Sequence, residues 1–312
     1  MVAVFRAEDV RRAVPPLEAY EAVRAGFVAH AHGEWTMPPK VYVTNYPAGD
    51  FRAMPALGGG HALLKWVTSF PGNPARGLPT VTGLALLSDA ENGRLLAVLD
   101  AAAVTALRTA AAAALAAETL ARSDASSWAV VGAGVNGAES ARLLAALGRS
   151  PVVWDLDQRR RREVADGLGL EVATSAEDAL AADVVVTVTP GSQPLYRAGS
   201  LRPGQHVSLM GADGPGKAEV ELAELERARL FCDDWEQASH GGELAAAVEA
   251  GGVQRSDATE LGAVLTGTAE GRRDADEITL FDSTGLAIQD LAIARLAYSK
   301  VRELDGLQRI EL

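Results

Sequence analysis

Two basic side chains stand in surroundings that should be apolar, and a buried charge is a candidate for chemistry. Arg108 lies midway along a run of alanine and leucine, and Lys65 lies inside the apolar run 61–67. An unpaired charge in such a place is costly, so each residue needs an anion. For both, the anion is either a ligand group, such as a substrate carboxylate or a cofactor phosphate, or a structural Asp or Glu. A lysine whose pKa is depressed by burial can also serve as an acid or base.

A glycine-rich turn is the second candidate site. The apolar run 128–131 leads directly into Gly-Ala-Gly-Val-Asn-Gly, and a helical stretch, 138–147, follows. In such a strand, turn and helix, the first glycine permits a tight turn, the second lets the backbone approach a pyrophosphate, and the third lets helix and strand pack closely. The alternative is an ordinary glycine turn. We assign to a dinucleotide site Gly132, Gly134, Val135, Asn136 and Gly137.

An acidic residue follows this turn at the spacing that a dinucleotide site needs. Asp155 ends the apolar run that starts at Val152, and it lies 18 residues after Gly137. A carboxylate there can accept a hydrogen bond from the adenosine ribose 2′-hydroxyl and would repel a 2′-phosphate. We therefore expect NAD rather than NADP. The arginine run 159–162 has two interpretations, a grip on a 2′-phosphate or a solvated helix face, and we favour the second.

Three more candidates lie at the ends of expected strands. Thr189 and Met210 end the runs 184–189 and 206–210, and we assign both to the cofactor site. Asp213 lies in the loop after Met210, at the carboxyl end of the strand, where open α/β sheets bind their ligands. Asp213 either meets the nicotinamide crevice or is a turn residue that caps the next helix.

The elements that must position these residues fall into two patterns. The first hundred residues predict an α+β arrangement, with an amphipathic helix over 17–30 and strands over 40–44 and 80–87. After residue 121, short β-branched runs alternate with helical stretches, which indicates a doubly wound parallel sheet. The strands expected in that sheet are 128–131, 152–155, 184–189, 206–210, 230–232 and 278–281.

A last apolar helix, over 286–301, is expected to return to the first domain. The predicted fold is therefore α/β, with a Rossmann domain over 118–289 and a discontinuous α+β domain made of 1–117 and 290–312.

Composition excludes several classes of function. The net charge of −12 would repel nucleic acid and an anionic membrane surface. With Cys232 as the sole cysteine and a first segment that lacks the apolar core of a signal peptide, we expect a cytoplasmic protein. Charges interrupt the alanine-rich stretch 101–121, so we expect a buried helix rather than a membrane span. His240 and Glu243 suggest a metal pair, but no third ligand has a suitable spacing, so no metal site is expected.

Further motifs extend over nearly the whole chain. They are 37–42 (MPPKVY), 49–55 (GDFRAMP), 64–67 (LKWV), 71–74 (PGNP), 77–81 (GLPTV), 107–109 (LRT), 211–217 (GADGPGK), 240–243 (HGGE) and 281–290 (FDSTGLAIQD). In these motifs the chain resembles the ornithine cyclodeaminase and mu-crystallin family, and within it the archaeal type of alanine dehydrogenase. Together they are far more specific than the glycine turn.

The resemblance implies a discontinuous N-terminal domain that binds substrate and forms a homodimer, joined to a Rossmann domain. It also implies that the residues matching Lys65 and Arg108 hold the substrate near the nicotinamide. The aspartate matching Asp213 would handle protons. Thr80 and Thr109 fall where members of the family touch the cofactor.

One departure separates the branches of the family. Ornithine cyclodeaminases resemble this chain around Met54 but carry a glutamate, which receives the distal ammonium of ornithine, where this sequence has Arg52. A cation there would repel that ammonium by on the order of 1 to 4 kcal/mol at a partly screened site. Cyclodeaminases also have an arginine in place of Lys40, and Lys40 with Arg52 matches the alanine dehydrogenase branch. Both residues are expected to help Arg108 bind a substrate carboxylate.

The resemblance therefore predicts reversible, NAD-dependent oxidative deamination of L-alanine or a similar small amino acid to its 2-oxo acid and ammonia. Asp213 or Lys65 would activate the water that attacks the imine, and the residues do not decide between them. The alternatives are a ketimine or imine reductase, an ornithine cyclodeaminase, and a non-catalytic ligand-binding protein of the mu-crystallin type.

Overall fold

The structure is a computed structural model that describes residues 1–190, 193–212, 214 and 217–311. The chain forms two compact units, Met1–Arg108 with Leu286–Leu312, and Thr109–Gly285. The first unit contains both ends of the chain, and the second is one continuous segment. The sequence-based domain boundaries, after residues 117 and 289, lie somewhat further along the chain and stay a prediction.

A seven-stranded sheet lies at the centre of the first unit, in the order β14-β1-β6-β5-β4-β3-β2. Its strands are β1 (Val2–Phe5), β2 (Val41–Asn45), β3 (Gly49–Gly58), β4 (His61–Ser69), β5 (Val81–Asp89), β6 (Leu95–Asp100) and β14 (Gln308–Ile310). Neighbouring strands from β2 to β6 are antiparallel, whereas β1 runs parallel to β6. Strands β2 and β5 begin one residue after the predicted starts.

Strand β4 shows how this sheet sorts its side chains. Leu63, Lys65 and Val67 are buried, whereas Leu64 and Trp66 are exposed. Successive side chains of a strand point to opposite faces of the sheet. Lys65 therefore faces the interior of the unit, although its neighbours along the chain face outward.

The helices of the first unit include the predicted last helix. They are α1 (Ala7–Ala13), α2 (Pro16–Ala31), α11 (Ala287–Ser299) and a short 3-10 helix (Asn73–Arg76). Helix α11 packs against α2 and against β3, β4 and β5. It thus covers the buried face of the strand that carries Lys65.

Helix α3 (Ala101–Leu120) is the alanine-rich helix. By length and composition alone it could cross a membrane, but 78% of its most apolar stretch is buried inside the protein. Burial of this kind is typical of a core helix, and alanine has the highest intrinsic helix propensity. The structure therefore agrees with a buried helix at this place.

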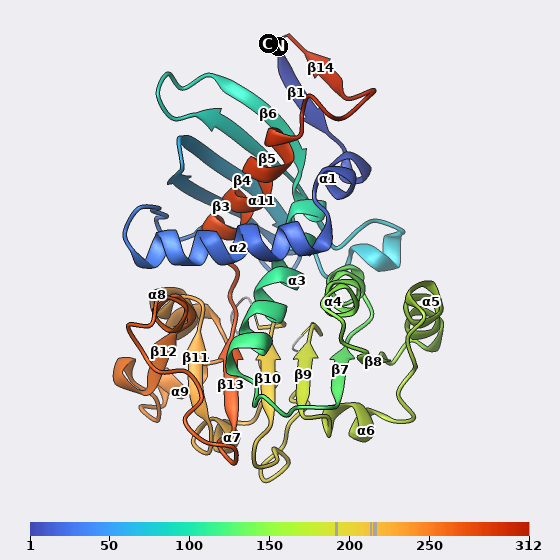
Figure 1. Cartoon of the computed structure of the whole chain (residues 1–312), viewed down its shortest axis with the longest axis vertical. Coiled ribbons are helices and arrows are strands. Elements are labelled where there is room, and N and C mark those ends of the chain that lie inside the picture. Colours follow the sequence, from blue (N-terminus) through green and yellow to red (C-terminus); the bar gives the residue numbers. More distant parts are fainter. Residues whose placement is uncertain (191–192, 213, 215–216, 312) are drawn as a thin grey trace. The chain divides into compact units, whose positions relative to one another are not determined.

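Seven parallel strands form the sheet of the second unit, in the order β12-β11-β13-β10-β9-β7-β8, and Figure 1 shows them side by side. They are β7 (Trp128–Val131), β8 (Val152–Trp154), β9 (Val184–Thr187), β10 (His206–Leu209), β11 (Arg229–Cys232), β12 (Ala258–Glu260) and β13 (Thr279–Asp282). The order of the strands reverses between β7 and β9, which makes their carboxyl ends the topological switch point where such sheets bind ligands. The predicted α/β fold with a doubly wound Rossmann sheet is confirmed.

The helices of this unit connect its strands. They are α4 (Val135–Ala146), α5 (Gln158–Leu168), α6 (Ala176–Leu180), α7 (Leu222–Leu225), α8 (Trp235–Gly241), α9 (Ala245–Glu249), α10 (Leu261–Leu265) and a 3-10 helix (Arg255–Asp257). Helix α4 directly follows the glycine turn, as predicted, and begins three residues earlier than expected.

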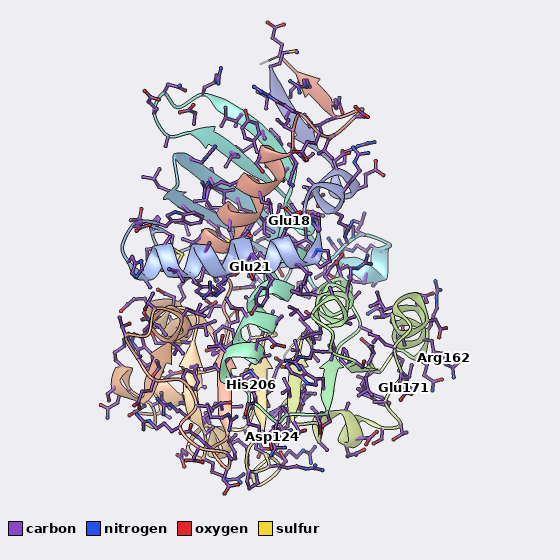
Figure 2. All side chains as sticks on the ribbon, in the orientation of Figure 1. Glu18, Glu21, Asp124, Arg162, Glu171 and His206 are labelled. Atoms are coloured by element: carbon purple, nitrogen blue, oxygen red, sulfur yellow. The ribbon has the colours of Figure 1, made fainter. Side chains whose placement is uncertain are left out.

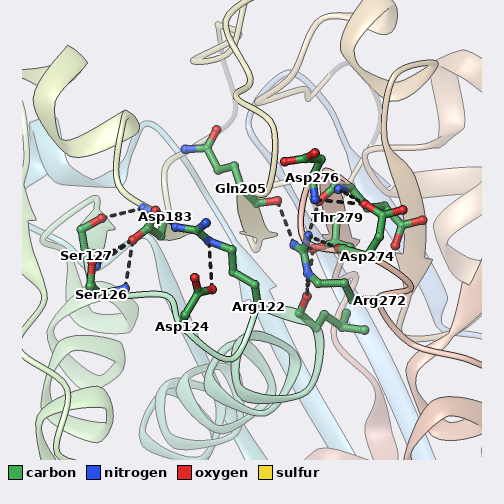
Figure 3. Close-up of polar contacts among 12 residues, drawn as sticks. Arg122, Asp124, Ser126, Ser127, Asp183, Gln205, Arg272, Asp274, Asp276 and Thr279 are labelled. Carbon is green, nitrogen blue, oxygen red and sulfur yellow. Dashed lines mark hydrogen bonds and ion pairs between the residues drawn. The ribbon is translucent and has the colours of Figure 1, made fainter.

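The amino ends of the parallel strands are fixed by a polar network around Asp183 (Figure 3). Its carboxylate accepts hydrogen bonds from the N–H groups of Ser126 (2.9 Å) and Ser127 (3.0 Å) and from Arg122 (2.8 Å). Burial alone would raise the pKa of Asp183, but these hydrogen bonds and the charge of Arg122 hold it well below its usual range. This edge of the sheet is therefore held together by contacts within the protein.

His206 lies on β10, inside the second unit (Figure 2). Its ring nitrogens lie 2.9 Å from Thr279 Oγ1 and 3.0 Å from Ser208 Oγ. Burial lowers the pKa of His206 to about 3, and the charge of Arg272 acts in the same direction. His206 is therefore a neutral, structural histidine at physiological pH.

Candidate active site

Lys65 is the centre of a buried polar cluster in the first unit. Its side chain is 1% exposed, and its ammonium lies 2.7 Å from Asp290 Oδ2 on α11. The ammonium also donates a hydrogen bond of 3.2 Å to Thr105 Oγ1 on α3. Strand alternation places the lysine on the buried face, where two helices supply its partners.

Arg108 approaches the same carboxylate from α3. Its Nε lies 3.5 Å from Asp290 Oδ1, and its Nη1 donates a hydrogen bond of 3.4 Å to Gln289 Oε1. The Nε of Arg108 is buried and has no hydrogen-bond partner among the described residues. Of the two anions considered for Lys65 and Arg108, the structure supplies the structural one, and both residues share it.

The charges of this cluster do not balance. Lys65 and Arg108 together face one carboxylate, so a positive charge remains when Lys65 is protonated. Burial lowers the pKa of Lys65 to about 8; the charge of Asp290 raises it, and the charges of Arg108 and Lys40 lower it. The cluster therefore favours an additional anion, and Lys65 can exchange a proton near neutral pH.

Arg52 has a partner that the sequence-based argument did not include. Its Nε lies 2.6 Å from Asp50 Oδ1, and both residues are buried on β3. Its guanidinium also lies over the ring of Tyr42. Asp50 compensates the charge of Arg52. The pair therefore repels the distal ammonium of ornithine less strongly than an uncompensated arginine would. A role of Arg52 in binding substrate stays a prediction.

The glycine turn of the second unit has the geometry that a dinucleotide needs. Gly132 has a φ of +104°, and a Cβ at Gly137 would clash with the carbonyl oxygen of Gly132. A Cβ at Gly134 would meet nothing within 4 Å in the described structure, so this side of the turn is open. In that part of the chain, no side chain caps the N-terminus of α4. The free N–H groups and open approach fit a pyrophosphate.

Asp155 also fits its predicted place. It directly follows β8, and its Oδ2 accepts a hydrogen bond of 2.6 Å from the N–H of Ala133 within the glycine turn. The other oxygen accepts a hydrogen bond of 2.8 Å from the N–H of Asp157. The carboxylate is thereby held beside the turn, where a ribose hydroxyl of a bound dinucleotide would need it.

The arginines that follow Asp155 have partners of their own. Arg159 pairs with Glu163 and Arg160 with Asp157, and both arginines are exposed. Arg161 stacks on Trp154, 4.1 Å from the ring centroid. Figure 2 shows Arg162 at the outside of α5. These contacts favour the solvated helix face over a grip on a 2′-phosphate.

Glu219 joins the carboxyl ends of β9 and β10. Its carboxylate accepts hydrogen bonds from the hydroxyl of Thr187 (2.7 Å), from the hydroxyl and N–H of Thr189 (2.5 and 3.1 Å), and from the N–H of Gly211 (3.0 Å). Burial raises the pKa of Glu219, and these hydrogen bonds oppose the shift. The structure thus brings Thr189, which follows β9, close to the turn that follows the neighbouring strand β10.

The remaining predicted site residues are Asp213, Thr80 and Thr109. Asp213 lies outside the described residues. Thr80 precedes β5, and its carbonyl oxygen accepts a hydrogen bond of 2.8 Å from the N–H of Phe70. Thr109 is buried, and its hydroxyl has no hydrogen-bond partner in the described part of the chain.

The HGGE motif has a structural arrangement. Glu243 accepts hydrogen bonds from the N–H groups of Glu219 (2.8 Å) and Val220 (2.7 Å), and His240 Nδ1 lies 2.7 Å from the carbonyl oxygen of Glu236. Burial raises the pKa of Glu243 to about 7, and the charge of Glu219 adds to the shift. Over the described ranges, no group of three or more His, Cys, Asp or Glu residues could hold a metal ion.

Comparison with known proteins identifies the family. The sequence profile of the ornithine cyclodeaminase/mu-crystallin family matches residues 2–305. The chain belongs to this family. It is 41% identical over 304 residues to the alanine dehydrogenase of Archaeoglobus fulgidus, a match that covers 95% of this chain and 94% of the relative. The resemblance inferred from the motifs is therefore confirmed.

Solved structures of family members agree with the fold. An archaeal alanine dehydrogenase dimer with bound NAD superposes with a TM-score of 0.93, at 39% identity and with 99% of each chain covered. The iminosuccinate reductase of Paracoccus denitrificans in complex with NAD⁺ superposes with a TM-score of 0.90, at 30% identity, covering 100% of this chain and 99% of that one. The family thus contains both dehydrogenases and imine reductases.

Some residues of this family member were not found as site residues from the sequence. Asp290 is the shared partner of Lys65 and Arg108, and its signal was an acidic residue inside a mainly apolar helix. Asp50 lies two residues before Arg52 on the same face of a strand, a spacing that predicts contact. Glu219 gave no local signal, because its partners lie on two other strands.

Proposed function

We propose that this chain is an NAD-dependent oxidoreductase that catalyses the reversible oxidative deamination of L-alanine, or a similar small amino acid, to its 2-oxo acid and ammonia. The observation that carries the proposal is the unbalanced cluster in which two cations, the buried Lys65 and the largely buried Arg108, share Asp290. A substrate carboxylate would supply the missing negative charge. The A. fulgidus alanine dehydrogenase, at 41% identity, supports this choice of substrate.

Each residue of the cluster has a distinct part in this proposal. Arg108 binds the substrate carboxylate, because its Nε makes no hydrogen bond within the described residues and can donate one to an added anion. Lys40 contributes positive charge at the same place, and Arg52, fixed by Asp50, orients the substrate. Lys65 transfers protons to and from water and the imine, alone or together with Asp213.

The residues of the glycine turn would hold NAD. When bound, NAD supplies a hydride acceptor for the Cα hydrogen of the amino acid. The N-terminus of α4 binds the pyrophosphate, with Gly134 allowing the close approach. Asp155 accepts a hydrogen bond from the ribose and disfavours a 2′-phosphate. Solved family members with bound NAD or NAD⁺ support this cofactor.

Steady-state consumption of NADH tests the proposal directly. We expect consumption with pyruvate only when ammonia is present, because the imine must form before it can be reduced. Consumption with cyclic imines and none with pyruvate and ammonia would favour the imine reductase, a choice that the iminosuccinate reductase supports. Conversion of ornithine to proline without net change in NADH would favour the cyclodeaminase. Binding of NADH with no turnover of any of these substrates would favour a mu-crystallin-like binding protein.

We also propose that the chain acts as a homodimer. Strand alternation gives the sheet of the first unit an outer face of exposed apolar side chains, and contiguous apolar patches of this kind occur at protein interfaces. These side chains are Val41, Val43, Leu57, Leu64, Trp66 and Leu84. The register of the sheet places Val41 opposite Ala53, Ala53 opposite Trp66, and Trp66 opposite Leu84. The patch therefore crosses the four strands β2, β3, β4 and β5. The archaeal alanine dehydrogenase dimer supports this assembly.

Light scattering after gel filtration tests the dimer. Trp66→Glu places a charge in the apolar face without touching the buried side of β4, so we expect the mass of a monomer and retained far-UV circular dichroism. Arg159→Glu, on the exposed face of α5, is the matched control and should keep the mass of the wild type. A wild-type monomer, or a dimeric Trp66→Glu variant, would rule out this interface.

A further inference from the structure

Asp290 is a buried carboxylate whose compensating charges lie outside its own helix. Helix α11 carries mainly apolar residues, and the side chain of Asp290 is 0% exposed. A buried carboxylate is costly unless charges or hydrogen bonds compensate it. The compensation comes from outside the helix, from Lys65 on β4 at 2.7 Å and from Arg108 on α3 at 3.5 Å.

The preceding residue strengthens this arrangement. Gln289 is fully buried, and its Oε1 accepts hydrogen bonds from Arg108 (3.4 Å) and from the N–H of Leu286 (3.3 Å). Gln289 therefore links the guanidinium to the first turn of α11. Two successive side chains of this helix thus face the cations of the cluster.

We infer that Asp290 is a positioning residue of the active site: its carboxylate fixes the ammonium of Lys65 beside the guanidinium of Arg108, and its charge sets how readily Lys65 exchanges a proton. The catalytic meaning of this inference rests on the proposed function. Its electrostatic part does not, because it concerns the protonation of Lys65 in the protein without substrate.

The groups around Lys65 leave this control to Asp290. Helix α3 contributes Arg108, and the segment before β2 contributes Lys40; both charges disfavour the ammonium. The register neighbours of Lys65 on β3 and β5 are apolar, Met54 and Ala85. Of the charges that act on Lys65 in the described part of the chain, that of Asp290 is the one that favours the ammonium. Loss of this charge therefore makes Lys65 release its proton at lower pH.

The pH profile of turnover is the first test. In Asp290→Asn, the limb of kcat/KM that reports Lys65 should move to lower pH by about 1 to 3 units, the usual effect of a close opposite charge. Asp290→Glu keeps the charge, so the limb should stay near its wild-type pH even if kcat falls because the side chain is longer. Asp183→Asn is the matched control: it removes a partly buried ion pair of the second unit and should leave the limb in place. An unmoved limb in Asp290→Asn would overturn the inference.

The pH dependence of unfolding by urea is the second test, and it needs no substrate. The folded wild type has a Lys65 pKa of about 8, below the usual 10.5, so the unfolded chain binds more protons between these values and stability rises with pH there. In Asp290→Asn this rise should begin at lower pH. In the double variant with Lys65→Met, the contribution should disappear. A rise that begins at the same pH in Asp290→Asn as in the wild type would contradict the inference, whereas absence of alanine turnover alone would contradict only the proposed function.

Discussion

The two compact units each bury a group of charged side chains, and the groups differ in how their charges are satisfied. In the first unit, Lys65 and Arg108 share the carboxylate of Asp290. In the second unit, Glu219 accepts four hydrogen bonds from hydroxyl and backbone donors, and Glu243 accepts hydrogen bonds from the backbone around Glu219.

Burial of a charge has different consequences in the two units. A carboxylate that accepts several hydrogen bonds is satisfied by the fold itself, so it can serve structure alone. Two cations that share one carboxylate leave a positive charge in a place where water does not compensate it. We therefore propose that the cluster around Lys65 binds an anionic ligand, whereas the carboxylates of the second unit are satisfied by contacts within the protein.

The largest effect is expected from Lys65. Lys65→Met keeps the length of the side chain but removes the proton-carrying group, so turnover of pyruvate with ammonia should fall by about 10² to 10⁴. NADH consumption at saturating substrate measures the loss. Asp183→Asn is the control, because it leaves the Lys65 cluster and the glycine turn intact. Near-normal turnover in Lys65→Met would remove the lysine from the chemistry and weaken the contrast between the two units.

A smaller effect is expected from Asp155. Replacement by serine removes the charge that opposes a 2′-phosphate, so the preference for NADH over NADPH should fall by about 10-fold to 100-fold. The ratio of kcat/KM for the two cofactors measures it. Arg162→Ser, at the outside of α5, should leave the ratio unchanged; if it alters the ratio as much as Asp155→Ser does, the arginine run holds the phosphate after all.

The smallest effect concerns Glu243 and appears in stability. Its folded pKa of about 7 lies above the usual 4.5, so the folded chain binds more protons between these values. By linkage, the contribution of Glu243 to stability is present below pH 4.5 and is lost as pH rises toward 7. Urea unfolding from pH 4.5 to 7.5 should show this decline in the wild type and a flatter profile in Glu243→Gln. Equal slopes would mean that Glu243 does not titrate in this window.

The second unit was predictable because its signals are local. Strand β7, the glycine turn and α4 follow one another within about twenty residues. The glycines have their roles only in this order of strand, turn and helix. The same local spacing predicted a carboxylate near the turn, and Asp155 accepts a hydrogen bond from it. Glu219 was not predicted, because the strands that it joins become neighbours only when the sheet forms.

The first unit shows the opposite limit. Lys65 and Arg108 were recognised as charges that need an anion. The sequence did not show which anion, because Asp290 lies on α11, far from both residues along the chain. The structure shows the structural acid, since Asp290 lies beside both cations, and a ligand anion at the same place stays a proposal. The partner of Arg52 could have been predicted, because residues two apart on a strand lie on the same face and Asp50 precedes Arg52 by two. This pairing weakens the repulsion expected between Arg52 and the distal ammonium of ornithine.

Calorimetric titration of pyruvate into protein saturated with NADH tests the contrast between the two units most directly. We expect the wild type and Glu243→Gln to bind pyruvate with similar affinity, and Arg108→Gln to bind it at least 10-fold more weakly because a charged hydrogen bond is lost. Unchanged affinity in Arg108→Gln, or a comparable loss in Glu243→Gln, would contradict the claim that the unbalanced cations of the first unit form the carboxylate site.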